Sequence, residues 1–516
     1  MTRWFNVAGP CRPDIHYMLA ATARLPEVLQ LIAQQSYFVL HAPRQTGKTT
    51  AMLTLAQELT ASGQYVAVVL SLEVGAPFTD DPPLAEAAVL SSWRNDALAR
   101  LGPMHQPPPW PDAEPGAKIR TALRTWAQSS HLPLVLFLDE IDALQDAALV
   151  SVLRQLRAGF ADRPSAFPHA LALIGLRDVR DYKVASGSSN RLRSTSPFNI
   201  KVESLTLRNF TADEVAELYA QHTAETGQVF TADALTHAFD LTQGQPWLVN
   251  ALARQAVEVI VPDPTRPVDE AAINAAKERL IARQDTHLDS LAERLREERV
   301  RRIIEPMLAG RTLEAVPMED IQFVLDLGLC RMHPHGGLII ANPIYREVLP
   351  RVLAGTPAAS LPQIAATWLT PTGELDPPRL LLAFLAFWRQ HGEPLLRSAP
   401  YAEIAPHLVL MAFLHRVVNS GGTLEREYAI GRDRMDLCLR YGAVTLGIEL
   451  KVWRENRADP LAAGLQQLDG YLAGLGLDSG WLVIFDQRPG QPPIADRTDT
   501  AEATTPGGRV VTVIRA

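Results

Sequence analysis

The sequence predicts an α/β protein in three parts: a front part built on a parallel sheet, a helical middle, and a rear part with a mixed sheet. In the front part, short apolar runs alternate with segments of helical length, which is typical of a parallel sheet covered on both faces. Residues 211–260 and 269–308 show the periodicity of helices. After residue 400, a helix is followed by runs in which polar and apolar residues alternate, as in strands.

The composition is that of a folded protein and excludes several classes. The 516 residues allow about three domains, and the 47% hydrophobic and 21% charged residues are close to globular averages. The strongest apolar runs, 380–388 and 404–414, are shorter than the about 20 residues that cross a bilayer. Three cysteines without a CxxC pair support neither a disulfide framework nor a cysteine zinc site. We therefore expect a cytoplasmic protein without a membrane partner. The prokaryotic origin that we also expect rests on the resemblances described below.

The net charge limits the kind of partner that the chain can bind. Its formal value is −8, which excludes a general polyanion binder. A nucleic-acid contact would therefore need a local basic surface.

The front part and the middle carry local signals for each element. Four apolar runs are expected as strands, namely Tyr37–His41, Val66–Leu70, Leu134–Leu138 and Ala170–Gly175. The proline-rich stretch 103–115 predicts an inserted loop, since proline cannot continue a helix or a central strand. Thr211 and Glu214 form a capping box at a helix start. The runs 329–332 and 338–341 predict a hairpin and, with the helices before it, a winged-helix-like module.

The first candidate site is a phosphate-binding loop. Residues 42–49 (APRQTGKT) lie between the first strand and a helix, which is the layout of a P-loop. Backbone N–H groups and the helix N-terminus surround an anion in such a loop. The predicted nucleotide-binding residues are Ala42, Pro43, Arg44, Gln45, Thr46, Gly47, Lys48, Thr49 and Thr50.

The roles within this loop follow from side-chain chemistry. Lys48 is expected to reach the β- and γ-phosphates of ATP, and the Thr49 hydroxyl is expected to ligate Mg²⁺. Gly47 allows a close backbone approach that a Cβ would block. Ala42 stands where the first glycine of the motif is usual, and it has less φ freedom than glycine.

Two carboxylates end the third apolar run. Asp139 and Glu140 follow LVLFL, and ionised side chains at a buried strand end are costly without partners. Asp139 is therefore expected to hold the Mg²⁺ shell, and Glu140 to polarise the attacking water as a general base. The alternative is that Asp139 or Asp142 caps the following helix. The two motifs together predict binding and hydrolysis of ATP.

The sequence DEID at 139–142 resembles the AAA-like ATPases, and more narrowly the branch with the STAND signalling NTPases and archaeal-type ATPases. The likeness covers about residues 10–350. It implies that Arg177, after ALALIG, senses the γ-phosphate, although Arg180 competes for that role. It also implies that Pro246, in GQPWL, faces the nucleotide, where the alternative is an ordinary turn between helices. The opening block of the chain, with Arg24 ahead of the first strand, resembles the family's entry to the adenine side of the site.

The rear part holds a second candidate site. Because strand side chains alternate, Glu449 and Lys451 share one face, and Asp436 of the preceding strand can join them. Two carboxylates suit Mg²⁺, and the lysine could orient or deprotonate a water. The alternative is a surface sheet on which Glu449 and Lys451 merely pair.

The order of these elements resembles the PD-(D/E)XK nuclease superfamily over about residues 380–487. A helix with Gln467 and Tyr471, four residues apart, matches the QxxxY helix of its exonuclease branch. The resemblance implies metal ligands Asp436 and Glu449, a catalytic Lys451 and a supporting Gln467. Glu403 in the leading helix is a candidate for an extra acid, and Met435 stands where the family usually has a proline, which leaves the expected ligands in place. The local balance of charge makes Arg432, Arg434 and Arg454 candidates for phosphate contacts, with a solvated surface as the alternative.

The predicted domains follow from these assignments and from the proline- and glycine-rich breaks. They are an ATPase core at 1–205, a helical lid at 206–290, a winged-helix-like module at 291–355, a linker at 356–378, a nuclease-like domain at 379–490 and a tail at 491–516. The stretch 487–508 is expected to be loosely ordered, with a last strand at 510–514.

The predicted function is an ATP-hydrolysing switch that controls a Mg²⁺-dependent DNA nuclease domain. Besides ATP and DNA, the candidate partners are further copies of this chain or another protein. One alternative is a non-catalytic scaffold whose assembly depends on ATP. Another is a DNA-binding regulator with a degenerate nuclease fold.

Overall fold

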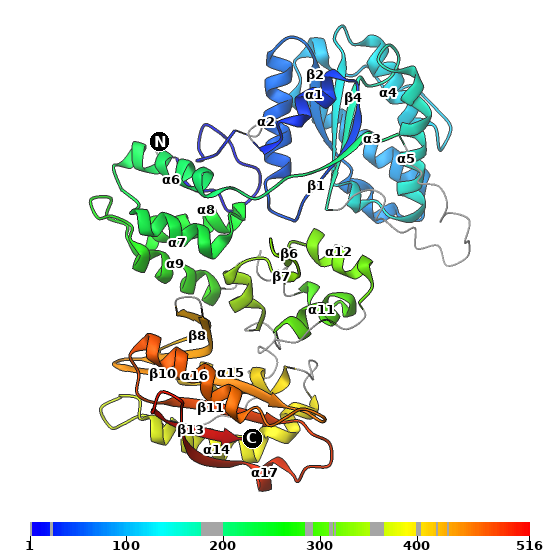
Figure 1. Cartoon of the computed structure of the whole chain (residues 1–516). Coiled ribbons are helices and arrows are strands. Elements are labelled where there is room, and N and C mark those ends of the chain that lie inside the picture. The colour runs from blue at the N-terminus through cyan, green and yellow to red at the C-terminus, as the bar shows by residue number, and fades with distance from the viewer. Residues whose placement is uncertain are drawn as a thin grey trace. The chain divides into compact units, whose positions relative to one another are not determined.

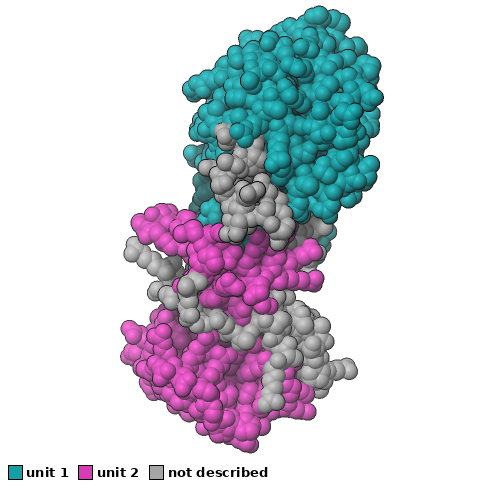
Figure 2. Space-filling view, turned by 90° about the vertical axis from the view of Figure 1, so that its right-hand side faces the viewer, with its two compact units in different colours: residues 1–283, 322–331 teal, residues 284–321, 332–516 magenta. Residues whose placement is uncertain are grey.

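The computed structural model describes residues 3–20, 24–176, 200–283, 293–308, 313, 316–350, 366–398, 404–418, 422–430 and 433–516. The chain separates into two compact units, which Figure 2 colours separately. Unit 1 contains residues 1–283 and 322–331, and unit 2 contains residues 284–321 and 332–516. Over the described residues, no helix combines the length and the apolar character that a membrane span requires.

Unit 1 is built on a five-stranded parallel sheet in the order β2-β3-β4-β1-β5. Its strands are β1 (Tyr37–His41), β2 (Val66–Ser71), β3 (Leu134–Asp139), β4 (Ala170–Gly175) and β5 (Glu203–Thr206). The first four confirm the strands expected from the apolar runs. The fifth, ESLT, has one buried residue and gave no apolar signal. The α/β class with a parallel sheet is thus confirmed.

Helices cover both faces of this sheet (Figure 1). One face packs against α1 (Glu27–Ala33) and α2 (Lys48–Ala61), in a core that includes Phe38 and Leu40. The other face packs against α3 (Pro82–Arg100), α4 (Lys118–Ser129) and α5 (Asp146–Gly159). Because side chains alternate along β1, its even- and odd-numbered residues enter different cores.

The helical part of unit 1 follows β5. Its helices are α6 (Ala212–Thr226), α7 (Ala232–Thr242), α8 (Pro246–Gln255) and α9 (Glu270–Arg283). The capping box expected at the first of them is confirmed: the Glu214 N–H donates to Thr211 Oγ1 at 3.2 Å, and the Thr211 N–H donates to Glu214 Oε2 at 2.8 Å. The helix therefore starts where the sequence predicts.

The expected hairpin is also present. It pairs β6 (Cys330–Met332) with β7 (Leu338–Ile340), after the helices α11 (Glu298–Leu308) and α12 (Met318–Asp326). The winged-helix identity of these elements, like the domain boundaries given above, stays a prediction.

Unit 2 contains a six-stranded mixed sheet in the order β12-β13-β11-β10-β9-β8. Its strands are β8 (Gly422–Ile430), β9 (Asp433–Tyr441), β10 (Val444–Trp453), β11 (Gly480–Asp486), β12 (Asp499–Thr504) and β13 (Val510–Arg515). The pairs β8–β9, β9–β10 and β12–β13 are antiparallel, whereas β10–β11 and β11–β13 are parallel. Helices α14 (Pro377–Ser398) and α15 (Ala405–Val418) pack on one face, and α16 (Leu461–Leu475) packs on the other.

The C-terminal residues belong to this sheet. The strand expected at 510–514 is confirmed as β13, but the stretch expected to be loosely ordered contains β12, which pairs with β13 from Asp499 to Thr504. The residues of β12 are exposed or half-buried and mostly Thr, Ala and Glu. An edge strand of this composition has no apolar alternation from which it could be predicted.

Candidate functional site

The predicted phosphate loop connects β1 to α2. Its nine predicted residues, 42–50, run from the end of β1 into the first turn of α2. Gly47, directly before the helix, has a φ of 88°, which glycine adopts without strain. Ala42 is buried, and its N–H donates to Gly175 O at 3.3 Å, so alanine at this position keeps its bond to the neighbouring strand.

Lys48 lies inside the curve of the loop. Its Nζ donates to Ala42 O at 2.7 Å and to Pro43 O at 2.9 Å. Burial lowers the pKa of Lys48 to about 8, and the nearby carboxylates of Asp142 and Asp139 oppose this shift. The ammonium group is thus held inside the loop by two backbone carbonyl groups.

The threonine and the aspartate expected at the metal are in direct contact. Thr49 Oγ1 donates to Asp139 Oδ2 at 2.7 Å, although the two residues are ninety positions apart. Asp139 is buried at the end of β3, and its Oδ1 accepts the Glu140 N–H at 2.9 Å. A hydroxyl and a carboxylate are hard oxygen donors of the kind that Mg²⁺ prefers, so the residues fit this ion.

Glu140 begins the turn after β3 in a left-handed conformation, with a φ of 58°. Its Oε2 accepts from Ser71 Oγ at 3.2 Å, and Ser71 lies opposite Asp139 in the β2–β3 register. Burial, followed by the charge of Glu73, raises the pKa of Glu140 to about 7. Sequence reasoning missed Ser71 and Glu73, whose only signal is that they follow an apolar run.

The alternative role of the carboxylates as helix caps is not what the structure shows. Helix α5 begins after Gln145 without a side-chain cap, and Asp142 Oδ1 instead accepts the Leu176 N–H at 3.3 Å. Asp142 therefore ties the turn after β3 to the end of β4. The predicted sensors Arg177 and Arg180 lie outside the described residues.

The proline element of the helical part lies at the same site. Pro246 starts α8, and the Gln245 side chain caps this helix by accepting the Leu248 N–H at 2.6 Å. The Gln245 amide nitrogen also donates to the loop at Gln45 O, at 3.4 Å. Gly244 is required before this element, since a Cβ there would lie 1.9 Å from Phe210 O.

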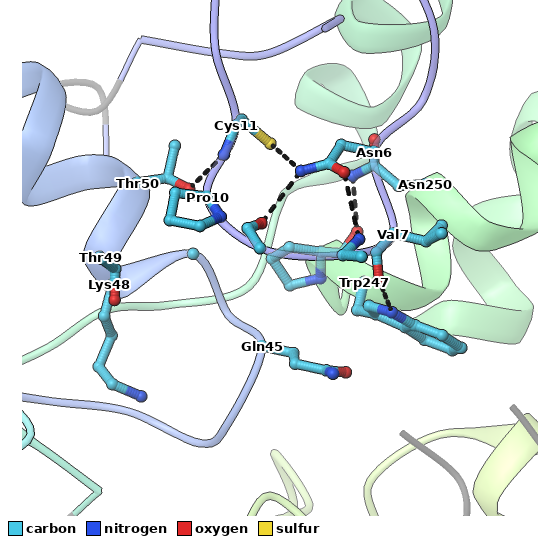
Figure 3. A pocket seen from close by; sticks show the side chains of 14 residues that line it. Asn6, Val7, Pro10, Cys11, Gln45, Lys48, Thr49, Thr50, Trp247 and Asn250 are labelled. Carbon is cyan, nitrogen blue, oxygen red and sulfur yellow. Dashed lines mark hydrogen bonds between the residues drawn. The ribbon is translucent and has the colours of Figure 1, made fainter. Parts of the chain in front are cut away.

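A pocket of about 260 Å³ lies between these elements (Figure 3). The loop and α2 contribute Gln45, Gly47, Lys48, Thr49 and Thr50, whereas α8 contributes Pro246, Trp247 and Asn250. Residues 6–11 complete the wall, and they are held there by bonds from Trp247 Nε1 to Val7 O at 2.8 Å and from the Cys11 N–H to Thr50 Oγ1 at 3.0 Å. The P-loop thus borders a solvent-open pocket whose wall is made by three separate segments of unit 1.

Arg24 contacts the back of the loop and is not among the residues that line the pocket. Its guanidinium donates to Thr46 O at 3.1 Å and to Arg208 O, and it stacks on Phe210 at 4.8 Å. Burial lowers the pKa of Arg24 to about 10. In this structure Arg24 therefore positions the loop, and the contact with adenine that its resemblance implied is not shown.

The rear site lies on the face of the unit 2 sheet that α16 covers. Glu449 of β10 is 2% exposed, and its Oε1 accepts from Lys451 Nζ at 2.5 Å. Asp436 of β9 accepts the Leu450 N–H at 2.8 Å. Burial, followed by the charge of Asp436, raises the pKa of Glu449 to about 8. The predicted convergence of the three side chains is therefore present.

The donor set at this second site fits a divalent cation. Within the described part of the chain, the buried Glu449 Oε2 has no hydrogen-bond partner, and a carboxylate oxygen left in this way is costly. A hard cation between Glu449 and Asp436 would satisfy it. Over the same residues, no group of three or more His, Cys, Asp or Glu side chains is placed to hold a metal ion. The protein ligands at this site are therefore limited to the two carboxylates. The pair with Lys451 exists, and in it Glu449 is buried whereas Lys451 is half-buried.

The other predicted residues of the rear site are not shown in contact with Glu449 by the described part of the structure. Gln467 lies exposed on α16, and no described hydrogen bond connects it with Glu449. Glu403, Arg432 and the side chain of Arg434 lie outside the described residues.

An aromatic and cationic pair near this site was missed by sequence reasoning. The Arg488 guanidinium lies 3.5 Å from the ring centre of Trp453, at the end of β10. Arg488 also forms an ion pair with Asp486 at 2.6 Å. Arg454, which the sequence suggested for phosphate contact, follows Trp453 and is half-buried.

No protein-family model matches the sequence, and no curated protein matches it. Similar solved structures include a Walker-type ATPase of Pyrococcus abyssi, at 13% identity and a TM-score of 0.46, over 67% of this chain and 99% of that chain. Thermotoga maritima RuvB, a Holliday junction branch migration motor, has 16% identity and a TM-score of 0.34, over 62% and 89%. The Aeropyrum pernix ORC1 protein in complex with DNA has 15% identity and a TM-score of 0.35, over 67% and 95%. Because these TM-scores lie below 0.5, we base no function on them.

Proposed function

We propose that unit 1 binds ATP together with Mg²⁺ and hydrolyses it. The observation that carries this proposal is the 2.7 Å contact between Thr49 and Asp139 beside the loop that holds Lys48. A strand end supplies the carboxylate and a helix start supplies the hydroxyl, which is the arrangement that P-loop chemistry requires. The pocket along residues 6–11 and α8 supplies room for the nucleoside.

Each residue of this site has a role that its geometry supports. The backbone N–H groups around Gly47 and the start of α2 bind the phosphates, and Lys48 adds a positive charge. Thr49 and Asp139 would hold Mg²⁺, which neutralises phosphate charge when it is bound. Glu140 orients the attacking water and accepts its proton, while Ser71 holds the carboxylate in place.

The variant Glu140→Gln tests the hydrolytic step. It removes the proton acceptor but keeps the side-chain shape, so we expect the ATPase rate to fall by about 100-fold or more while ATP affinity stays within about threefold. The measurement is steady-state phosphate release beside equilibrium binding of ATP. Glu58→Gln, on the exposed surface of α2, is the matched control. An unchanged rate in Glu140→Gln would show that another group is the base.

We also propose that unit 2 cleaves DNA with a divalent metal. Asp436 and Glu449 would hold the ion, which stabilises charge at the phosphodiester when it is bound. Lys451, at 2.5 Å from Glu449, lies where it can orient a water beside that ion. The unpartnered Glu449 Oε2 is the observation that supports this part of the proposal.

Nucleotide state is proposed to control the rear domain. Support comes from residues 322–331, which group with unit 1 although the chain on both sides of them belongs to unit 2. Gly328 in this segment packs on the phosphate loop so closely that a Cβ would lie 2.7 Å from the Pro43 ring. Arg331 donates to the Gln243 side chain at 3.0 Å, next to the proline element. A shift of the loop on binding phosphate would therefore displace a segment that is continuous with unit 2.

A further inference from the structure

We propose that Arg488 of unit 2 binds a backbone phosphate of DNA beside the rear site. This inference rests on the proposed nuclease function and adds to it a residue that is not part of the metal site. Arg488 follows β11, and its neighbours hold its guanidinium in one orientation while part of the side chain stays accessible to solvent. A group of this kind can bind an anion without first being ordered.

The Trp453 ring, over which Arg488 lies, is on the same face of the sheet as Glu449 and Lys451. β10 pairs with β11 residue by residue from Gly447 to Trp453 without a bulge, so the alternation of side chains along β10 is unbroken. Trp453 also packs against the core that α16 covers. Two residues of a strand span about 7 Å, so Trp453 is the next side chain beyond Lys451 on this face. A group held at Trp453 therefore borders the place where DNA is proposed to be cleaved.

Contacts with an aromatic ring and a carboxylate fix the orientation of Arg488. Its guanidinium lies 3.5 Å from the Trp453 ring centre, and the Trp453 indole N–H donates to Arg457 O at 3.1 Å. Arg488 Nε donates to Asp486 Oδ1 at 2.9 Å, and its Nη2 donates to Asp486 Oδ2 at 2.6 Å. The ring sets the position of the group, and the paired bonds to one carboxylate set its direction.

The remaining donors of Arg488 are available to a ligand. A guanidinium has five N–H donors, and the side-chain bonds to Asp486 use two of them. Among the described residues Nη1 has no acceptor, and it is not one of the buried atoms left without a partner, so it is in contact with solvent. The side chain of Arg488 is 31% exposed, whereas that of Asp486 is 15% exposed. The cation is thus the more accessible member of the pair.

Arg515 brings a second guanidinium to the same ring. Its group lies 5.3 Å from the Trp453 ring centre, and its Nη2 donates to Asp459 Oδ2 at 2.7 Å. Arg515 is in β13, which runs parallel to β11, as β10 does, so the ends of these strands meet at one edge of the sheet. A phosphate bound at Arg488 would therefore have a second cation nearby.

The arrangement fits a phosphate better than a base. Arg488 covers a face of the Trp453 ring, which is therefore not free to stack on a base. A planar guanidinium with unused donors matches the oxygens of a phosphodiester, and hydrogen bonds between these charged groups are stronger than neutral ones. A contact of this type positions DNA and carries no sequence information.

The salt dependence of DNA binding by the full chain tests the role of Arg488. Wild type and Arg488→Gln are titrated with a fluorescent linear duplex, without divalent metal, over a range of NaCl concentrations. We expect Arg488→Gln to bind about tenfold more weakly at about 0.1 M salt, with a slope of log K against log salt that is shallower by about 0.9, because one phosphate contact is lost. Two duplexes of unrelated sequence should lose affinity equally. Arg379→Gln, on α14 at the opposite face, removes another arginine paired with an aspartate and is the matched control.

Wild-type affinity and slope in Arg488→Gln would overturn this inference alone. The slope reports the number of phosphate contacts and not the amount of active protein, so a partly unfolded variant would not imitate the expected change. If Arg488→Gln does not fold, Arg488→Lys replaces it. Lysine keeps the charge without the planar fork, so we expect binding at least about threefold weaker, and wild-type affinity would overturn the inference. A wild type that neither binds nor cleaves DNA would instead overturn the proposed nuclease function, and this inference with it.

Discussion

Replacing Lys48 by alanine is expected to weaken ATP binding by at least about 100-fold, which corresponds to roughly 3 kcal/mol. The Lys48 ammonium is the cation held inside the loop, between Ala42 O and Pro43 O. Its removal takes away hydrogen bonds between the ammonium group and the phosphates. Such charge-assisted hydrogen bonds are about twice as strong as hydrogen bonds between neutral groups. Equilibrium titration with ATP and Mg²⁺ measures the change.

The control for this experiment is Lys118→Ala, at the first residue of α4 and outside the pocket. It removes the same charge from the same unit, and its ATP affinity should equal that of the wild type. Retained ATP affinity in Lys48→Ala would contradict the assignment of the loop as a phosphate site.

A second large effect is expected from Glu449→Gln, which should lower the rate of metal-dependent DNA cleavage by at least about 100-fold. The reason is that the variant would lose a ligand of the metal, and a bound metal supplies several kcal/mol of charge stabilisation. The substitution keeps the size of the side chain but removes the charge that would hold the ion. Cleavage of linear duplex and single-stranded DNA with Mg²⁺ or Mn²⁺ provides the measurement. Glu502→Gln, on the exposed edge strand β12, removes a similar charge away from the site and should cleave normally.

Thermal unfolding separates a lost metal site from a lost fold in this variant. Glu449 is buried beside another carboxylate, and this burial opposes its charged form. Without metal, Glu449→Gln should therefore keep its folded structure. The wild type should gain thermal stability from added metal, because an ion that binds only the folded state stabilises it. Equal gains in both proteins, or equal cleavage rates, would show that Glu449 is not a ligand.

The sequence was sufficient for the residues whose positions follow from regular geometry. Thr49 and Asp139 were expected at one Mg²⁺ ion because Thr49 belongs to the P-loop motif and Asp139 is a carboxylate at the end of a buried apolar strand. Asp436, Glu449 and Lys451 were expected on one face because strand side chains alternate. The contacts at 2.7 Å and 2.5 Å follow these rules.

Other features depend on pairing and packing that no local pattern shows. Ser71 reaches Glu140 only because β2 pairs with β3 in one particular register. Asn250 is a polar residue on a helix that is buried on most sides, so its place beside the pocket could not be predicted from periodicity. The burial of Glu449 results from the cover that α16 and the neighbouring strands provide, and alternation alone predicted only its face.

The proposed function requires that nucleotide bound in unit 1 controls DNA cleavage by unit 2. The most direct measurement is the cleavage rate of the full chain with Mg²⁺, with and without ATP, in the wild type and in Lys48→Ala. We expect the wild-type rate to change at least about fivefold with ATP, which is the lower end of usual allosteric couplings, and the rate of Lys48→Ala to stay the same. A wild-type cleavage rate that is the same with and without ATP would contradict it.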